Sequence, residues 1–313
     1  MGKRVAVKVP ATTANLGPGF DVLGMALKLH NTVILEETGD CRFAVEVLGE
    51  GAELLPRNTD NLAAKVVLRL FKKMSRSLQG WKLQLYNEIP LQRGLGSSAA
   101  AIVGGLLAAN AVLGNPFSCD ELLAEAIEIE GHPDNVAAAF LGGIVAVAED
   151  KGKYFFTSFA PPKELMVYAV VPQFALSTEV ARHALPELVP LRDAVFNLSR
   201  LALLITALKE AKWELLRVAL NDRLHQPYRS RLIPGMEDAF KAAEDAGAYG
   251  AVLSGAGPTL IALGPPGLKI GDAMACALKA YGVEAIVKEL EPISQGAYII
   301  EGDFNVREAF EWV

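Results

Sequence analysis

The chain has 313 residues, of which 51% are hydrophobic and 21% are charged, and its net charge is −6. This length permits two domains of ordinary size, and the composition is that of a globular protein rather than a disordered one. The acidic balance gives no support to a nucleic-acid partner, whose phosphates attract a basic surface.

The N-terminus leads directly into an alternating strand pattern, Lys3–Pro10, and lacks the apolar core of a secretory signal. Three widely spaced cysteines, Cys41, Cys119 and Cys276, form neither a disulfide framework nor a metal-binding pattern. These features predict a reduced, cytoplasmic compartment.

The stretch Ala11–Asp21 is dense in turn-forming residues, with Asn15 and Asp21 flanking Gly17-Pro18-Gly19. Asn and Asp at such places commonly bond the nearby backbone, so these residues alone favour turn formation over a substrate role. Two strands are expected next, Leu29–Glu37 and Cys41–Gly49, joined as a hairpin at Gly39-Asp40.

A helix is predicted to begin at Asp60-Asn61-Leu62, because apolar residues then recur at helical spacing up to Met74. Asn61 could cap this helix or face a nucleotide, and capping is the simpler interpretation.

A glycine-rich turn follows the predicted strand Trp81–Ile89 and precedes Ala99–Leu113, an apolar segment without charge that predicts a buried helix. The turn reads Pro90-Leu-Gln-Arg-Gly-Leu-Gly-Ser-Ser-Ala-Ala100. Gly94 and Gly96 permit positive φ and a close approach of a ligand to the backbone. The serines after them stand at a helix start, where unpaired N–H groups favour an anion and a hydroxyl can ligate a cation. A phosphate-binding loop is therefore predicted.

Other interpretations of this turn are weaker. Gly94-x-Gly96-x-x-Ala99 formally matches a dinucleotide fingerprint, but Pro90–Arg93 separates it from its strand and no acidic residue closes a second strand. A P-loop with its lysine is absent from the sequence. A membrane span would need roughly 20 apolar residues, and polar side chains interrupt this run. A helix cap without a ligand remains the simplest alternative.

A second polar cluster lies where two predicted helices meet. Ser118–Glu121 is a capping box that opens a helix running to Glu130, Gly131 ends this helix, and Pro133 begins the next one. The cluster holds three acids, an imidazole and an amide: Glu128, Glu130, His132, Asp134 and Asn135. A role in complementing the helix dipole and a role as a site have about equal weight here. No zinc motif is present, so Mg²⁺ is expected if any metal binds.

The remainder alternates strands and helices, and the domains are expected to cover residues 1–152 and 153–313, with Pro161-Pro162 as a second candidate boundary. Ser177 or Thr178 caps a helix that contains Arg182. Arg229 lies in a basic connector, where arginines are commonly solvated. Both arginines would nonetheless suit a carboxylate-bearing ligand, because guanidinium groups bind carboxylates through two parallel hydrogen bonds.

Three motifs in the expected order resemble those of the GHMP kinases, which phosphorylate galactose, homoserine, mevalonate and phosphomevalonate. These motifs are Pro10–Asp21, Pro90–Ala100 and Gly250–Thr259, which together span nearly the whole chain. Within this superfamily the chain is similar to the homoserine kinases in four segments: Ala14–Asp21, Glu130–Asn135, Ser177–Arg182 and Pro227–Arg229.

The resemblance implies an α+β, two-domain fold, with an N-terminal ATP-binding domain, a ferredoxin-like C-terminal domain and an active site in the cleft between them. It implies ATP, Mg²⁺ and L-homoserine as ligands and no membrane partner; long apolar helix faces are compatible with a homodimer. The nucleotide would contact these residues: Asn61, Pro90, Arg93, Gly94, Leu95, Gly96, Ser97, Ser98 and Ala99.

The same resemblance places Mg²⁺ on Ser98 and Glu130, with Glu128 as the alternative carboxylate. Homoserine would be held by five side chains: Asn15, Asp21, His132, Arg182 and Arg229. Asp21 suits the ammonium group of the substrate, and the arginines suit its carboxylate. Asp134 and Asn135 are the catalytic candidates, and the choice between a general base and simple positioning stays open. Another small-alcohol kinase, such as a mevalonate kinase, and a non-catalytic ATP-binding protein are the competing functions.

Overall fold

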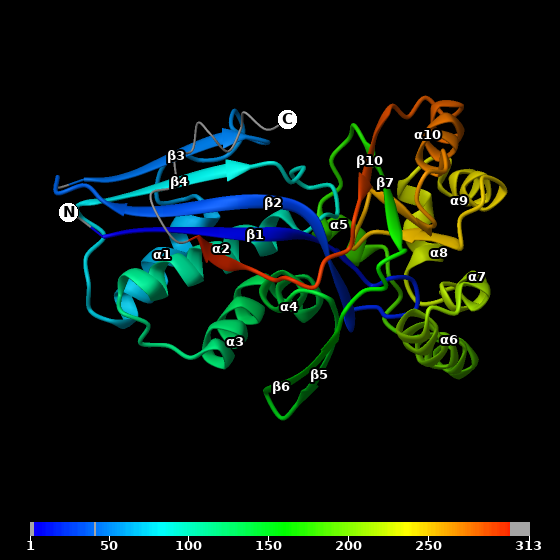
Figure 1. The fold of residues 1–313 in the computed structure, drawn as a ribbon, viewed down its shortest axis with the longest axis horizontal. Coiled ribbons are helices and arrows are strands. Elements are labelled where there is room, and N and C mark those ends of the chain that lie inside the picture. The colour runs from blue at the N-terminus through cyan, green and yellow to red at the C-terminus, as the bar shows by residue number, and fades with distance from the viewer. Residues whose placement is uncertain (1–2, 41, 301–313) are drawn as a thin grey trace.

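The structure is a computed structural model that describes residues 3–40 and 42–300. It contains a larger unit built on one sheet and a smaller unit built on another, which lie at the left and right of Figure 1. Strands and helices form the larger unit as follows: β1 (Arg4–Ala14), β2 (Leu23–Glu37), β3 (Phe43–Gly49), β4 (Trp81–Asn87), β5 (Ile144–Asp150), β6 (Lys153–Phe159), β11 (Tyr298–Ile300), α1 (Leu62–Lys73), α2 (Ser97–Val112), α3 (Cys119–Glu130) and α4 (Pro133–Leu141). Cys41, the first residue of an expected strand, lies outside the described residues.

The long strand β2 organises the first sheet. It pairs with β1 along its length, with β4 at one end and with β5 at the other, and all three pairings are antiparallel. The hairpin expected at Gly39-Asp40 is wrong, because β4 lies between β2 and β3 and pairs with β3 in parallel. A parallel pair needs a crossover, which α1 provides, and local turn residues cannot reveal that inserted strand.

The predicted buried helix is confirmed as α2, which contacts β1, β2 and the other three helices on that face of the sheet. Its side chains Ile102, Val103 and Leu106 are 0% exposed, which explains why the segment carries no charge. Among the described residues, no helix combines the length and the apolar character needed to cross a bilayer.

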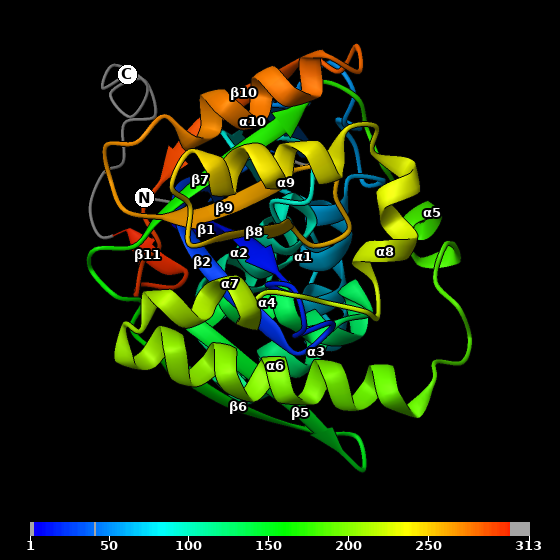
Figure 2. The ribbon, with the colours of Figure 1, turned by 90° about the vertical axis from the view of Figure 1, so that its right-hand side faces the viewer.

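The second unit has the order β7 (Met166–Pro172), α9 (Met236–Asp245), β8 (Gly250–Leu253), β9 (Leu260–Gly264), α10 (Ile270–Lys279) and β10 (Ala285–Leu290). Its sheet has the order β10-β7-β9-β8, antiparallel throughout, and α9 and α10 pack against it. This is the ferredoxin-like arrangement, so the prediction for the C-terminal unit is confirmed. Figure 2 shows the two helices side by side in front of the strands.

Between β7 and α9 the chain forms a series of short helices and one long helix, which in Figure 2 lie below and beside the ferredoxin-like sheet. They are α5 (Thr178–His183), α6 (Leu191–Glu210), the 3₁₀ turn η1 (Trp213–Leu215), α7 (Leu216–Ala219), α8 (Gln226–Arg229) and the 3₁₀ turn η2 (Ser230–Leu232). The basic connector that contains Arg229 is thus partly helical.

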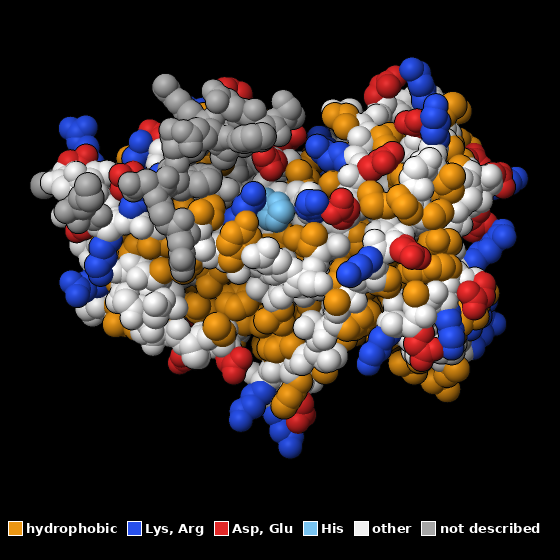
Figure 3. Space-filling model, in the orientation of Figure 1, with side chains coloured by type: hydrophobic (Ala, Val, Ile, Leu, Met, Phe, Trp, Pro, Cys, Tyr) orange, Lys and Arg blue, Asp and Glu red, His pale blue; other side chains and the backbone are white. Residues whose placement is uncertain are grey.

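The first sheet extends past residue 152, because β6 pairs with β5 along its whole length. We therefore propose to place the domain boundary near Pro161-Pro162, which follows β6 directly. The C-terminal strand β11 returns to the first sheet and pairs with β1. On the face drawn in Figure 3, basic and acidic side chains are interspersed.

Candidate active site

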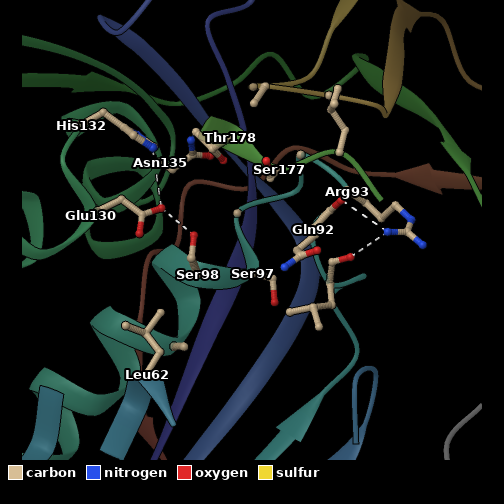
Figure 4. Close-up of a pocket in the computed structure, with 18 of the residues that line it drawn as sticks. Leu62, Gln92, Arg93, Ser97, Ser98, Glu130, His132, Asn135, Ser177 and Thr178 are labelled. Carbon is tan, nitrogen blue, oxygen red and sulfur yellow. Dashed lines mark hydrogen bonds and ion pairs between the residues drawn. The ribbon is translucent and has the colours of Figure 1, made fainter. Parts of the chain in front are cut away.

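A cleft of about 360 Å³ is lined by strands, helices and loops of the first unit and by residues 176–178, 182, 229 and 255–257 of the second. Figure 4 shows Ser98, Glu130, His132 and Asn135 on one side of it, with Gln92 and Arg93 on the other. It therefore brings the glycine-rich turn and the acidic corner into one space.

The glycine-rich turn has the conformation that its glycines predict, with φ of 80° at Gly94 and 73° at Gly96. Gly96 is the N-cap of α2 and supplies no side chain to cap it. The backbone N–H groups of residues 94–99 donate to no acceptor in the described part of the chain. Unpaired N–H groups at the start of a buried helix form a site for an anion.

The second glycine-rich turn, Ser254–Thr259, supports the first from behind. Ser254 Oγ donates to Gly94 O at 2.6 Å, and Thr259 N donates to Arg93 O at 3.2 Å. A Cβ on Gly94 would lie 2.4 Å from Ser254 O, so only glycine fits this approach. This contact holds the first glycine-rich turn against the smaller unit.

Ser98 and Glu130 form a close pair at the start of α2. Ser98 Oγ donates to Glu130 Oε1 at 2.6 Å, as the dashed line in Figure 4 shows. Burial raises the pKa of Glu130, although the hydrogen bond from Ser98 opposes this shift. Glu128 lies outside the cleft and pairs with Arg69 at 2.8 Å. The geometry therefore favours Glu130 over Glu128 as a ligand.

These two oxygens suit Mg²⁺, which commonly takes one or two protein ligands and completes its shell with phosphate oxygens and water. No group of three or more His, Cys, Asp or Glu residues within the described ranges could hold a metal by itself. A magnesium site with two protein ligands, completed by oxygens of the nucleotide, is consistent with both the Ser98–Glu130 pair and the lack of a larger ligand cluster among the described residues.

The corner between α3 and α4 is tightly hydrogen bonded. Asp134 Oδ1 lies 2.7 Å from His132 Nδ1 and accepts from the backbone N–H of Asn135 at 2.7 Å. Thr12, from β1, donates to Asn135 Oδ1 at 2.7 Å, which fixes the orientation of that amide. Burial works against the charged form of His132, but the contacts with Asp134 and Glu130 outweigh it and raise its pKa.

The cleft also carries the charged groups expected for an amino-acid ligand, Asp21, Arg182 and Arg229. Arg182 Nη1 and Nη2 donate to the two oxygens of Asp21 at 2.9 and 2.8 Å. Hydrogen bonding to Asp21 raises the pKa of Arg182, whereas burial and the charge of Arg182 lower the pKa of Arg229 to about 10. Arg229 is 1% exposed, so the expectation of a solvated connector arginine is wrong.

Most of the expected site residues border the cleft. The exceptions are Pro90, Leu95 and Ala99. They are buried, and Leu95 and Ala99 belong to the main hydrophobic cluster, so they shape the turn from inside. Asn15 borders the cleft but uses its amide within the protein, because Nδ2 donates to Gly255 O and Oδ1 accepts from Asp21 N.

Several lining residues were not expected from the sequence. One end of the cleft is apolar, with Leu55, Leu62, Leu85 and Leu91 beside Asn61. Asn31 and Asn87 also line it and pair directly between β2 and β4. Asparagine is uncommon in strands, so its presence in two predicted strands was the available signal. Ser177 and Thr178 complete the wall near Arg182.

The chain matches family models over two segments: GHMP kinases N terminal domain over residues 61–143 and GHMP kinases C terminal over residues 204–282. A homoserine kinase from Carboxydothermus hydrogenoformans is 47% identical over 304 residues, covering 96% of this chain and 99% of that protein. One from Moorella thermoacetica is 47% identical over 94% of this chain and 99% of that protein.

Among solved structures, homoserine kinase from Cytophaga hutchinsonii superposes with a TM-score of 0.84 at 31% identity, covering 95% of this chain and 97% of that one. Mevalonate kinase from L. major, at 19% identity and a TM-score of 0.68, shares the fold. The two-domain α+β fold, the matched family models and the relatives all indicate the same family. The chain belongs to the homoserine kinase family of the GHMP kinases.

Proposed function

We propose that this chain is an ATP-dependent kinase that phosphorylates the terminal hydroxyl of L-homoserine to give O-phospho-L-homoserine, a step of threonine biosynthesis. One observation carries the choice of acceptor: the cleft that contains the phosphate-binding turn also contains an acid and two arginines, Asp21, Arg182 and Arg229. A zwitterionic alcohol can use all three charges, whereas a neutral sugar can use none.

In this proposal the triphosphate lies against the free N–H groups of residues 94–99, and the base occupies the apolar end of the cleft near Asn61. The positive end of α2 stabilises negative charge on the phosphate oxygens. Ser98 and Glu130 would hold Mg²⁺, which when bound neutralises phosphate charge during transfer.

The acceptor would lie between Asp21 on one side and the two arginines on the other, with its ammonium group on the carboxylate. Arg182 and Asp21 bind each other in the structure, so both groups are already held in place by their partner. The substrate would replace this contact with two new ion pairs. Asn15 shapes the loop that carries Asp21.

Asn135 is the group we assign to the reacting hydroxyl. Since Oδ1 accepts from Thr12, the Nδ2 end is the donor, and it can orient the hydroxyl oxygen for in-line attack. Asp134 is 2% exposed and bonded to His132 and Asn135, so it holds these two side chains in place. Phosphoryl transfer relies mainly on positioning and charge neutralisation, so no general base is required.

The proposal extends to the cellular location and the oligomeric state of the enzyme. ATP as cosubstrate supports a cytoplasmic location.

A homodimer is proposed because α6 exposes an apolar stripe with helical spacing. The stripe is formed by Leu191, Val195 and Leu198, which are 80%, 54% and 66% exposed. Two copies of such a stripe can pack across a two-fold axis. Sedimentation velocity of Leu191→Asp against the unchanged chain tests this part.

A coupled ADP-release assay tests the main proposal with four conditions: L-homoserine, mevalonate, galactose and no acceptor. Homoserine-dependent release with Mg²⁺ is the expected result. Faster release with mevalonate would assign a different acceptor, and ATP binding without release under every condition would make the chain a nucleotide-binding protein without kinase activity.

A further inference from the structure

A buried polar chain connects Asp222, His225 and Arg229 behind the acceptor end of the cleft. The side chains of Asp222 and His225 are both 0% exposed, and neither borders the cleft. Arg229 is the one member that reaches the cleft, at the end of α8. The first two residues can therefore influence a ligand only indirectly, and Arg229 is the member of the chain through which they reach the cleft.

Contacts inside the protein use one part of the Arg229 guanidinium and leave another part free. Its Nε donates to Ala181 O at 3.2 Å, and its Nη1 donates to Gly255 O at 3.1 Å and lies 3.4 Å from His225 Nδ1. These contacts account for three of the five N–H groups of an arginine. No hydrogen-bond partner of Nη2 is present among the described residues, so Nη2 is the part available to a carboxylate.

The contacts of His225 define its tautomer. Its Nε2 lies 2.8 Å from the carbonyl oxygen of Gly17, and a carbonyl only accepts, so Nε2 carries the proton. Nδ1 is then an acceptor for Arg229. Phe20 stacks on the imidazole at a centroid distance of 5.2 Å, and its ring centroid also lies 5.2 Å from Arg229 Cζ. These contacts hold the imidazole and the guanidinium in a fixed relation.

Asp222 fixes the turn that carries the histidine. Its Oδ2 accepts from the backbone N–H groups of His225 and Gln226 at 3.0 and 2.7 Å, and its Oδ1 accepts from Asn197 Nδ2 at 2.7 Å. His225 and Arg229 are four residues apart, which places them on one side of the short helix. The aspartate thus sets where the histidine meets the arginine.

We propose that His225 is a positioning residue for the acceptor substrate: by accepting a hydrogen bond from Nη1 of Arg229, it directs Nη2 toward the substrate carboxylate. This inference rests on the proposed function and deepens it. Asp222 acts one step further back, by holding the backbone of the histidine.

The arrangement also makes the affinity for the acceptor substrate depend on pH. A protonated imidazole would direct an N–H group at the N–H group of Arg229, and both would be buried cations. Burial and the charge of Arg229 favour the neutral form of His225, while the carboxylates of Asp222 and Asp21 oppose this; the net result is a lowered pKa. Arg182, across Phe20, adds further positive charge. The KM for homoserine should therefore rise as pH falls below the ordinary range of histidine titration.

Two variants separate the two hydrogen bonds of the histidine. Asparagine places its Oδ1 near the position of Nδ1, so His225→Asn keeps an acceptor for Arg229 and cannot titrate. Glutamine places its terminal amide near the position of Nε2, so His225→Gln keeps the donor to Gly17 and lacks the acceptor. At pH 7.5 we expect His225→Gln to raise the KM for homoserine about ten-fold, with the KM for ATP and kcat little changed. His225→Asn should stay within about three-fold of the unchanged enzyme and should lose most of the rise in KM between pH 7.5 and pH 5.

The controls distinguish this inference from the proposed function. If the unchanged enzyme does not phosphorylate homoserine, the proposed function fails and this inference fails with it. If homoserine is a substrate but both variants raise its KM equally, or neither does, His225 does not position Arg229. Equal losses of affinity for ATP and homoserine, or a melting temperature lowered below the assay temperature in both variants, would show a general structural role and would also overturn the inference.

Discussion

Arg182 and Asp21, which are 161 residues apart in the sequence, form a two-bonded ion pair across the cleft, with N···O distances of 2.9 and 2.8 Å. The pair joins the first loop of the larger unit to α5 of the smaller one. Phe20, next to Asp21, lies under the guanidinium at 5.7 Å from Arg182 Cζ. In the proposed function, the ammonium group of an amino acid would take the place of Arg182 on Asp21, and its carboxylate would take the place of Asp21 on Arg182.

Removing the charge of Asp21 should weaken binding of the acceptor substrate and leave nucleotide binding unchanged. A charge-assisted hydrogen bond contributes about 1.5–3 kcal/mol, so Asp21→Asn should raise the KM for homoserine roughly ten- to hundred-fold with an unchanged KM for ATP. Asp193→Asn is the matched control, because Asp193 pairs with Arg223 at 3.1 Å away from the cleft. An equal effect of the two substitutions would contradict the assignment.

The magnesium assignment predicts different roles for two nearby glutamates. Glu130→Gln should lower kcat by about a hundred-fold and shift the magnesium requirement to higher concentration, because a neutral amide is a weaker ligand for a hard cation. Glu128→Gln should leave both quantities near their original values, since Glu128 pairs with Arg69 outside the cleft. Magnesium titrations at saturating ATP provide the measurement, and a stronger effect at position 128 would reverse the choice.

The sequence predicted the fold and site best where the signals are local. The capping box at Ser118 and the glycines at 94 and 96 have the geometry that their residue types predict. The hairpin at Gly39-Asp40 failed because β4, which comes from residues further along the chain, lies between the two strands. The same limit hid Thr12, whose hydroxyl meets Asn135 from 123 residues away. Burial of Arg229 likewise depends on acceptors from distant segments, the carbonyl groups of Ala181 and Gly255, which composition cannot reveal.

The glycine-rich turn Pro90–Ala100 should tolerate no side chain at Gly96. An L-residue in the left-handed region costs about 1–2 kcal/mol, and a Cβ here would also lie 2.0 Å from Thr12 Oγ1. Gly114 has a φ of 91° but no atom within 4 Å of an added Cβ, so Gly114→Ala isolates the backbone cost. Gly96→Ala should be less stable than Gly114→Ala by about 1–3 kcal/mol in denaturant unfolding, which is the usual cost of overpacking. It should also lose most ATP binding. Similar free energies of unfolding for both variants would show that the turn can accommodate a Cβ at position 96 without strain.

Stability should depend on pH through His30. Burial, and then the charges of Lys8 and Lys28, lower the pKa of His30 to about 4. A folded pKa below the unfolded one means that the unfolded state binds more protons between pH 6.5 and 4. The stabilisation is therefore fully present above pH 6.5 and is lost as pH falls through that window, by about 2 kcal/mol from pH 7.5 to pH 5. Denaturant unfolding should show a smaller change with pH for His30→Gln than for the exposed control His183→Gln; equal slopes would count against the shift.

The hydrogen bond from Thr12 to Asn135 predicts a graded loss of turnover. Asn135→Ala removes the group assigned to the acceptor hydroxyl, and we expect kcat to fall by about a hundred-fold or more, with little effect on ATP affinity. Thr12→Val keeps the volume of the side chain but leaves Asn135 Oδ1 without its donor, so the amide can rotate, and a loss of about ten-fold in kcat should follow. Thr206→Val is the control, because its hydroxyl bonds Ala202 O on the exposed side of α6. The contrary result is that Thr12→Val lowers kcat as much as Asn135→Ala while keeping the thermal stability of the unchanged protein. In that case Thr12 itself, and not Asn135, would orient the acceptor hydroxyl.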